Sequence, residues 1–217
     1  MAALCFGVQA ACPAPTAGVL LERFIAADCE SCWTTGNAAA VAPASPPFVL
    51  DWIVPSPRGE DAALSPAALA EATARAGAMP SGGLLQRRQA LKPLPGLRIS
   101  AQDGPAWNGY IGVRLHVAWR ATALPSGAVG YLALVETVPA GDDGTPIERR
   151  LVRALAGPLP LDSALASTDH LLALRIPPGA RPERLAAVGW VESPSGEVIA
   201  LAPANLGDCS TAGRPDA

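Results

Sequence analysis

The sequence has no long run of basic residues and no stretch in which basic and aromatic residues alternate. Of its 217 residues 16% are charged, and acidic and basic side chains are mixed along the chain to a net charge of −3. Nucleic-acid binding is not expected, because it depends on clustered positive charge. No apolar run of about 20 residues is free of prolines and charges, so no membrane-spanning helix is expected either.

Motifs for several common enzyme chemistries are also missing. There is no GxSxG nucleophile turn, and Asp169 and His170 are adjacent on a predicted strand, so they point to opposite faces and form no hydrolytic pair. No glycine-rich phosphate loop is present. His116 lies on the polar face of a strand as a solvated side chain, and neither histidine has ligand spacing to the other or to the cysteines. The sequence therefore predicts no metal and no cofactor.

Half of the residues are hydrophobic, which is typical of a packed globular protein. The first 15 residues, "MAALCFGVQAACPAP", are similar to the second half of a secretory signal, with small residues at Val8 and Ala10 before a cleavage point. We expect residues 1–11 to be the remnant of a signal peptide and the mature chain to begin near Ala11. This predicts a periplasmic or secreted bacterial protein.

Export determines how the five cysteines are interpreted. Cys5 would leave with the signal, and an even number of cysteines in an oxidising compartment predicts two disulfides. Cys29–Cys32 is the obvious first pair. The second is then Cys12–Cys209, a structural disulfide that ties the two ends of the mature chain together.

The first half of the chain has an α/β pattern. An apolar run at 18–25 predicts a strand, and the CxxC that follows begins a helix that ends before Pro43. A buried strand is predicted at 48–54 and a helix at 65–77, with Ser65 as its cap. A further helical segment is predicted at 82–91, "GGLLQRRQAL", before the chain divides near 92–95.

The second half has the pattern of an all-β domain. Residues 109–121 alternate apolar and polar side chains with a period of two, which indicates a strand with one wet face. Further strands, separated by turn residues, are predicted at 127–138, 147–155, 170–176 and 183–202, the last a hairpin. The prediction is therefore an α/β domain at 12–94 and an antiparallel β-sandwich at 95–217.

The CxxC itself fits redox chemistry. A helix amino end favours a thiolate at Cys29, and Cys32, one turn further along, is placed to resolve a mixed disulfide. Three interpretations remain open for the pair: a structural or vestigial disulfide, a redox-active dithiol and half of a metal site. The metal site has the least support, because zinc takes four ligands.

The stretch "LLERFIAADCESC" at 20–32 resembles the opening motif of a secreted bacterial family catalogued as domain of unknown function 1223. Glu22 and Phe24 stand at the family's distances before Cys29, and Ser31 precedes Cys32 as it does there. Segments 50–54, 148–155 and 194–202 are loosely similar to later strands of the family. The resemblance implies a thioredoxin-like domain fused to a β-sandwich, and it implies no established reaction.

The chain departs from the family after the second cysteine, where Trp33 and Thr34 replace prolines. The family's Thr-Pro-Gln segment, which supplies a cis-proline facing the disulfide, is not found, and Pro80 is the candidate to replace it. Asp51 has two interpretations: a buried proton acceptor for Cys32, as in thioredoxins, or a residue that caps the end of its strand.

Two functions are consistent with these features. One is thiol–disulfide exchange, in which Cys29 attacks, Cys32 resolves, and the partner is a protein dithiol or disulfide. The alternative is a non-catalytic periplasmic binding or envelope-accessory protein whose disulfides are structural.

Overall fold

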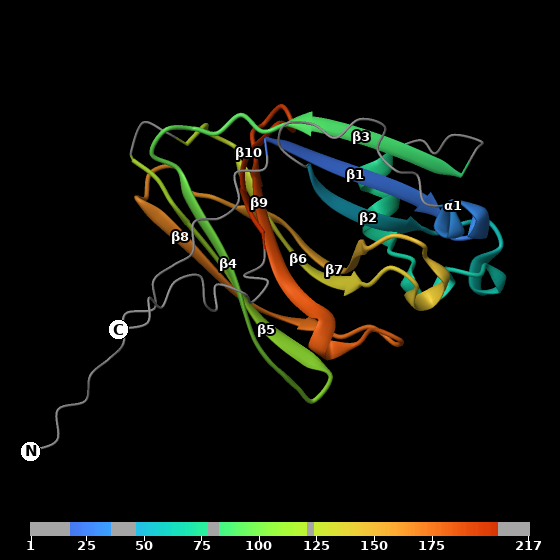
Figure 1. Cartoon of the computed structure of the whole chain (residues 1–217). Helices are drawn as coiled ribbons and strands as arrows, with labels where there is room; N and C mark the ends of the chain where they lie inside the picture. The colour runs from blue at the N-terminus through green and yellow to red at the C-terminus, as the bar shows by residue number, and fades with distance from the viewer. Residues whose placement is uncertain (1–17, 36–46, 78–82, 121–123, 204–217) are drawn as a thin grey trace, which may run out of the picture.

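The computed structural model describes residues 18–35, 47–77, 83–120 and 124–203, and strands make up most of them (Figure 1). The strands are β1 Val19–Ala26, β2 Phe48–Val54, β3 Leu84–Ala90, β4 Arg98–Trp107, β5 Tyr110–Ala118, β6 Val129–Val138, β7 Arg149–Pro160, β8 Ser167–Arg175, β9 Leu185–Glu192 and β10 Val198–Ala202. The helical segments are α1 Glu30–Thr34 and α2 Ala70–Ala76, with 3-10 turns η1 Gly59–Asp61, η2 Ser65–Ala67, η3 Asp142–Gly144 and η4 Pro182–Arg184.

Seven strands form one mixed sheet in the order β10-β9-β6-β7-β2-β1-β3. β1 pairs in parallel with β2 and antiparallel with β3. β2 pairs in parallel with β7 through Asp51 and Leu151, and the remaining neighbours are antiparallel. The sheet therefore contains strands from both sides of the boundary predicted near residue 94.

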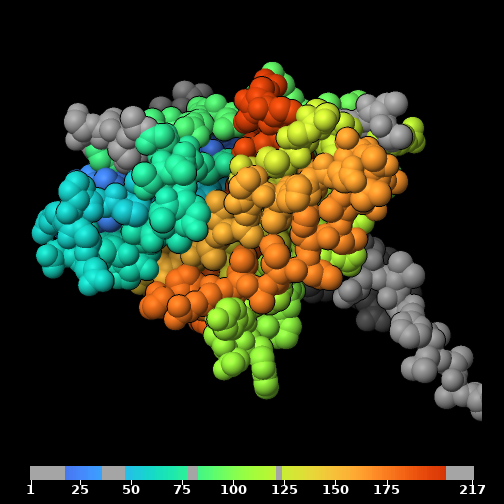
Figure 2. All heavy atoms as spheres, turned by 180° about the vertical axis from the view of Figure 1, so that it is seen from behind, coloured from blue at the N-terminus to red at the C-terminus, as the bar shows by residue number. Residues whose placement is uncertain are grey.

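The other three strands form an antiparallel sheet in the order β4-β5-β8. It packs against one face of the large sheet, where Leu115 and Val117 of β5 belong to the same buried cluster as Leu132 and Leu134 of β6. The tip of the β4–β5 hairpin projects beyond the rest of the molecule (Figure 2), and Trp107 at that tip is 83% exposed.

Alternation along the strands places α1 and α2 on opposite faces of the large sheet. In β2, Trp52 packs in a cluster with Ala72 and Ala76 of α2, whereas the next residue, Ile53, packs with Trp33 of α1. In β6, the same period of two puts Val138 on the α1 face, the face that the three-stranded sheet also covers. The disulfide and the three-stranded sheet therefore lie on the same face of the large sheet, at its opposite ends (Figure 1).

The predicted thioredoxin-like α/β fold is wrong. The described residues are mostly strand, and the two α-helices among them have only five and seven residues. Neither is long and apolar enough to cross a membrane. A thioredoxin-like domain needs helices that cover both faces of its own sheet. Here one face is covered largely by a second sheet, and the large sheet is completed by strands from the second half of the chain.

All three predicted helices differ from the structure. The helix after the CxxC ends at Thr34, with Thr35 extended, and the other two differ for identifiable reasons. The segment predicted as helix at 82–91 contains β3, which makes seven register pairs with β1. The helix predicted at 65–77 is divided into η2 and α2, because Ala68 forms a bridge with Ile53 and the Leu69 amide donates to the Ile53 carbonyl. In both places a hydrogen-bonded strand neighbour outweighs weak helical propensity.

The predicted antiparallel sandwich is also wrong. The expected strands are present as β5 to β10, but β7 joins the parallel strand β2, so the resulting sheet is mixed. No strand is predicted over β4, whose second half lies within 103–110, a segment with the Gly, Pro and Asn content of a turn. The turn is confined to Asn108 and Gly109, both with positive φ, and the residues before it belong to β4.

Candidate functional site

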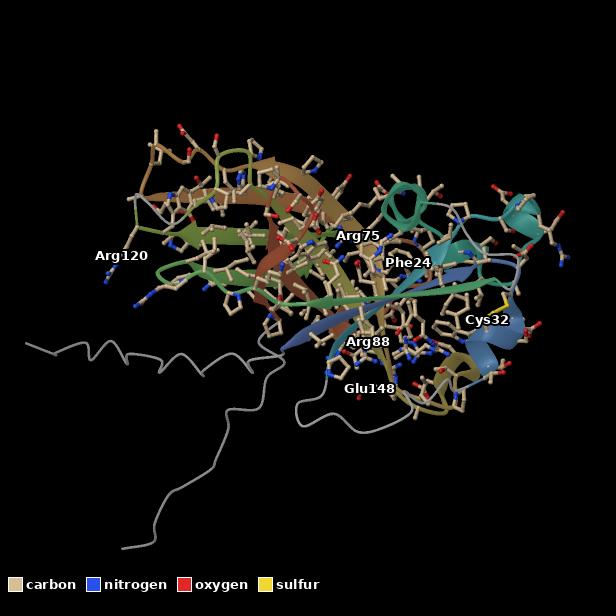
Figure 3. All side chains as sticks on the ribbon, turned by 90° about the horizontal axis from the view of Figure 1, so that it is seen from above. Phe24, Cys32, Arg75, Arg88, Arg120 and Glu148 are labelled. Atoms are coloured by element: carbon tan, nitrogen blue, oxygen red, sulfur yellow. A yellow bond between two sulfur atoms is a disulfide. The ribbon has the colours of Figure 1, made fainter. Side chains whose placement is uncertain are left out.

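Cys29 and Cys32 form a disulfide where β1 passes into α1 (Figure 3). Cys29 is the N-cap of α1, its amide donates to the Ala26 carbonyl at 2.9 Å, and the Cys32 amide donates to the Cys29 carbonyl at 3.0 Å. The Ala27 amide donates to the Val54 carbonyl at the end of β2. The predicted local order of strand, CxxC and helix is therefore confirmed within a fold that differs from the one expected.

The two sulfur atoms lie in different surroundings. Both cysteines are half-buried, but Cys32 packs against the apolar cluster that contains Ile25, Ile53 and Trp33. The Cys29 sulfur lies 3.6 Å from the hydroxyl oxygen of Ser31, which is exposed. In the reduced protein this hydroxyl can donate a hydrogen bond to a Cys29 thiolate, which would favour the charged form.

Gly83 covers the disulfide from the start of β3. Its carbonyl accepts from the Ala26 amide at 2.8 Å, and its φ is +72°. A Cβ at this position would lie 2.8 Å from the Cys29 Cβ, 2.9 Å from the Cys29 Sγ and 3.5 Å from the Cys32 Sγ. Only glycine fits this approach to the disulfide, because both the backbone angle and the space exclude a side chain.

A buried ionic cluster supports the other side of α1. The Arg149 side chain donates to the carbonyls of Trp33 at 2.6 Å and Cys32 at 3.3 Å, and its guanidinium lies 4.6 Å from the centre of the Trp33 ring. Asp51 binds Arg149 at 3.2 Å and Arg23 through both carboxylate oxygens, at 2.7 and 2.6 Å. We call Arg23, Asp51 and Arg149 the Arg149 cluster.

The Arg149 cluster carries two positive charges and one negative charge, all buried. Burial lowers the pKa of Arg149 below its ordinary value; Asp51 opposes this effect and Arg23 adds to it. Acidic side chains also flank the disulfide, since Asp28 and Glu30 are exposed at the start of α1. The buried charge beneath the helix that carries both cysteines is nevertheless positive, which is the environment that favours thiolates.

The structure places Asp51 differently from either interpretation of the sequence. It is fully buried in β2, and besides the two arginines its carboxylate accepts from the Arg150 amide at 3.3 Å. Its connection to the cysteines runs through Arg149. Sequence reasoning missed Arg149 and Gly83, although an Arg-Arg pair within a buried strand was an available signal for the first.

The remaining predicted residues lie elsewhere. Cys12, Cys209 and Pro80 are outside the described residues. His116 contacts Asp169 at 3.1 Å on the outer face of the three-stranded sheet, and a hydrogen bond from Arg114, together with His116, lowers the pKa of Asp169. Over the described ranges, no group of three or more His, Cys, Asp or Glu side chains is arranged to hold a metal ion.

Comparison with known proteins gives a likeness of fold alone. No family model matches the chain, and no curated protein matches it either. A solved structure, HBP35 of Porphyromonas gingivalis, is similar, with a TM-score of 0.52 at 10% sequence identity. The similarity covers 91% of this chain and 80% of that one.

Proposed function

We propose that the protein carries out thiol–disulfide exchange through Cys29 and Cys32. The proposal depends above all on the half-buried Cys29–Cys32 disulfide above the positively charged Arg149 cluster. Reactive cysteines occupy partly exposed, electropositive surroundings, whereas inert disulfides are buried among apolar groups. We assign Cys29 as the sulfur that meets the partner, because Cys32 packs against an apolar cluster whereas Cys29 lies beside the exposed Ser31.

The exchange proceeds in two balanced steps. A thiolate of a partner dithiol attacks the Cys29 sulfur, the Cys29–Cys32 bond breaks, and Cys32 leaves with the electron pair and takes up a proton. The partner's second thiolate then attacks the partner's first sulfur, the one bonded to Cys29 in the mixed disulfide. The bond to Cys29 breaks, and Cys29 leaves as a thiolate. The partner loses two electrons and becomes a disulfide, and this protein gains them as a dithiol.

The structural elements around the disulfide have separate parts in this scheme. Arg149 binds the Cys32 and Trp33 carbonyls in the last turn of α1 and lowers the electrostatic cost of a thiolate on either cysteine. Gly83 leaves room beside the sulfur atoms, because it has no side chain. The client is a protein dithiol or disulfide, and the chemistry requires a compartment in which the pair can be oxidised.

Export to the periplasm or the outside of the cell fits this requirement, and we retain it as part of the proposal. Kinship with the secreted family named above stays a prediction, without the thioredoxin-like fold that it implied. The alternative, a non-catalytic binding or envelope-accessory protein with structural disulfides, becomes the opposite outcome of the same experiment.

The test measures the reduction potential of the pair in the full chain and the alkylation of Cys29 in Cys32→Ser from pH 5 to 9, with peptide mapping to separate Cys29 from the other thiols. We expect a potential above about −300 mV and half-maximal alkylation below about pH 8.5. A potential below about −300 mV together with alkylation at or above pH 8.5 would leave only a structural disulfide. Cys29→Ser/Cys32→Ser is the control for background reactivity.

A further inference from the structure

A cavity of about 340 Å³ lies on the α1 face of the large sheet, beside the cluster on which Cys32 packs. Most of its wall is apolar, formed by Trp33, Ile53, Leu64, Ala67, Val138 and Leu151. This volume is at the lower end of the range of small-molecule sites, roughly 300–1,000 Å³, and an apolar wall with few polar groups is typical of them.

One corner of the cavity is polar and is formed by Arg153 and Glu136. Arg153 is 5% exposed, and its Nη2 donates to the Pro178 carbonyl at 2.8 Å. Its Nε makes no hydrogen bond and lies 3.5 Å from Oε2 of Glu136, a residue that is itself 3% exposed. Burial lowers the pKa of Arg153 and Glu136 opposes that shift, so desolvation of the guanidinium is only partly compensated.

The charges around the cavity are already balanced. Glu136 neutralises Arg153, and its other oxygen accepts from the Arg181 amide at 3.1 Å. Asp143, at the rim, pairs with the Arg181 side chain at 3.3 Å. A charged ligand would add an uncompensated charge beside the buried pair of Arg153 and Glu136, whereas a neutral group adds none.

We propose that this cavity binds a small, uncharged and largely apolar molecule that carries one hydroxyl or amide group. That group lies at the polar corner beside Arg153 and Glu136, where the guanidinium can donate a hydrogen bond to it and the carboxylate can accept one from it. The rest of the ligand lies against Trp33, Ile53 and Leu151. The site does not depend on redox activity at the neighbouring disulfide.

The test compares three probes of similar shape on the full chain: p-cresol, toluene and 4-methylbenzoate. Calorimetry, with NMR of the Trp33 indole N–H, gives affinity and location. We expect saturable 1:1 binding of p-cresol, about tenfold tighter than that of toluene, and weaker binding of the carboxylate. Equal affinity for toluene, tighter binding of 4-methylbenzoate, or no saturable binding of p-cresol would overturn the proposal, because an internal water would then suffice.

Two matched substitutions check the location. Ala67→Leu fills the cavity at a half-buried position and should abolish p-cresol binding. Ala74→Leu adds the same group to a second cavity, on the α2 face, and should leave the affinity unchanged. Binding that survives Ala67→Leu contradicts the assignment. If that variant does not fold, the unsubstituted protein still provides a test. A Trp33 indole N–H signal that does not shift when p-cresol binds also contradicts the assignment.

Discussion

The two faces of the seven-stranded sheet carry buried ionic clusters of opposite composition. On the α1 face, the Arg149 cluster has one carboxylate between two arginines. On the α2 face, Arg75 binds Glu22 and Glu192, so that one arginine lies between two carboxylates. Glu22 and Arg23 are consecutive in β1, and strand alternation alone sends them to opposite faces.

The surroundings of the two central arginines differ in the same sense. Burial lowers the pKa of Arg75, but Glu22 and Glu192 more than offset this, and the net shift is upward. The net shift of Arg149 is downward. Arg75 also lies 4.9 Å from the centre of the Trp190 ring and 5.4 Å from that of Tyr131, and these cation–π contacts further stabilise its positive charge. The disulfide lies on the face with excess positive charge, the sign that suits a thiolate.

The largest effect is expected from Asp51→Ala, which leaves Arg23 and Arg149 buried without their shared carboxylate. Breaking a buried pair in this way costs about 3–5 kcal/mol of unfolding free energy, measurable by urea denaturation. Asp61→Ala, at an exposed position, is the control and should stay within about 0.5 kcal/mol of the original protein. A loss below about 1 kcal/mol for Asp51→Ala would show that water already reaches the Arg149 cluster.

A smaller loss, about 2–3 kcal/mol at pH 7, is expected from Arg75→Met, because Arg75 and Glu192 are each about 10% exposed and keep some contact with water. Glu22 and Glu192 then lose their shared arginine, although Glu192 keeps the hydrogen bond from the Trp190 indole at 2.9 Å, and protonation removes their charge. The folded variant takes up protons before the unfolded chain does, so its deficit shrinks as the pH falls from 7 to 4.

The loss of unfolding free energy in Asp51→Ala should not shrink in this way over the same pH range. The charges left without a partner belong to arginines, which are already protonated. Parallel denaturation of both variants at several pH values therefore separates the two clusters. If both deficits responded to pH in the same way, the opposite signs assigned to the two faces would be wrong.

A substitution pair isolates the contact between β3 and the disulfide. Gly83→Ala places a Cβ against Cys29 at a positive φ and should cost about 1–3 kcal/mol in denaturant unfolding. Gly77→Ala has nearly the same φ, +71°, and no atom within 4 Å of the new Cβ, so its loss, about 1–2 kcal/mol, reports backbone strain without a clash. Equal losses would mean that the backbone near the disulfide yields to the added methyl group.

The smallest effect, on the redox equilibrium, links the comparison to the proposed function. Arg149→Met removes positive charge beneath α1, which disfavours the thiolate and shifts the reduction potential to more negative values by about 15–30 mV. Glutathione equilibration of the purified variant measures this shift. Arg75→Met, on the opposite face, is the matched control and should leave the potential within about 5 mV. A shift of the same size in both variants would remove the Arg149 cluster from the redox mechanism.

Local sequence patterns predicted the strands that have strong alternation or dense apolar runs, including β1, β2 and β5. They also placed the CxxC correctly between a strand and a helix. They failed at β3, whose "QRRQ" centre has helical propensity. That segment becomes a strand because β1 offers it seven backbone pairs along its full length. Helical propensity contributes little free energy compared with such a set of backbone hydrogen bonds.

The candidate site was predictable only in its cysteines. Arg149 and Asp51 are 98 positions apart, and no local pattern indicates that they touch. Gly83 lies beside the disulfide because β3 pairs with β1, and the residue just before β3 bonds to Ala26 at the end of β1. For each of these residues the sequence offered only the residue type as a signal. Strand pairing determined which groups the residue contacts.

The sequence by itself determined that the cysteine pair lies between β1 and α1, since β1, the CxxC and the turn between them are local features of one short segment. Only the tertiary structure decided that β2 and β7 lie side by side through Asp51 and Leu151. That pairing brings Arg149 beneath the cysteines and merges the two halves of the chain into one sheet. The physical reason is that strand pairing across a hundred residues depends on burial and hydrogen bonding of the whole sheet, which no short segment encodes.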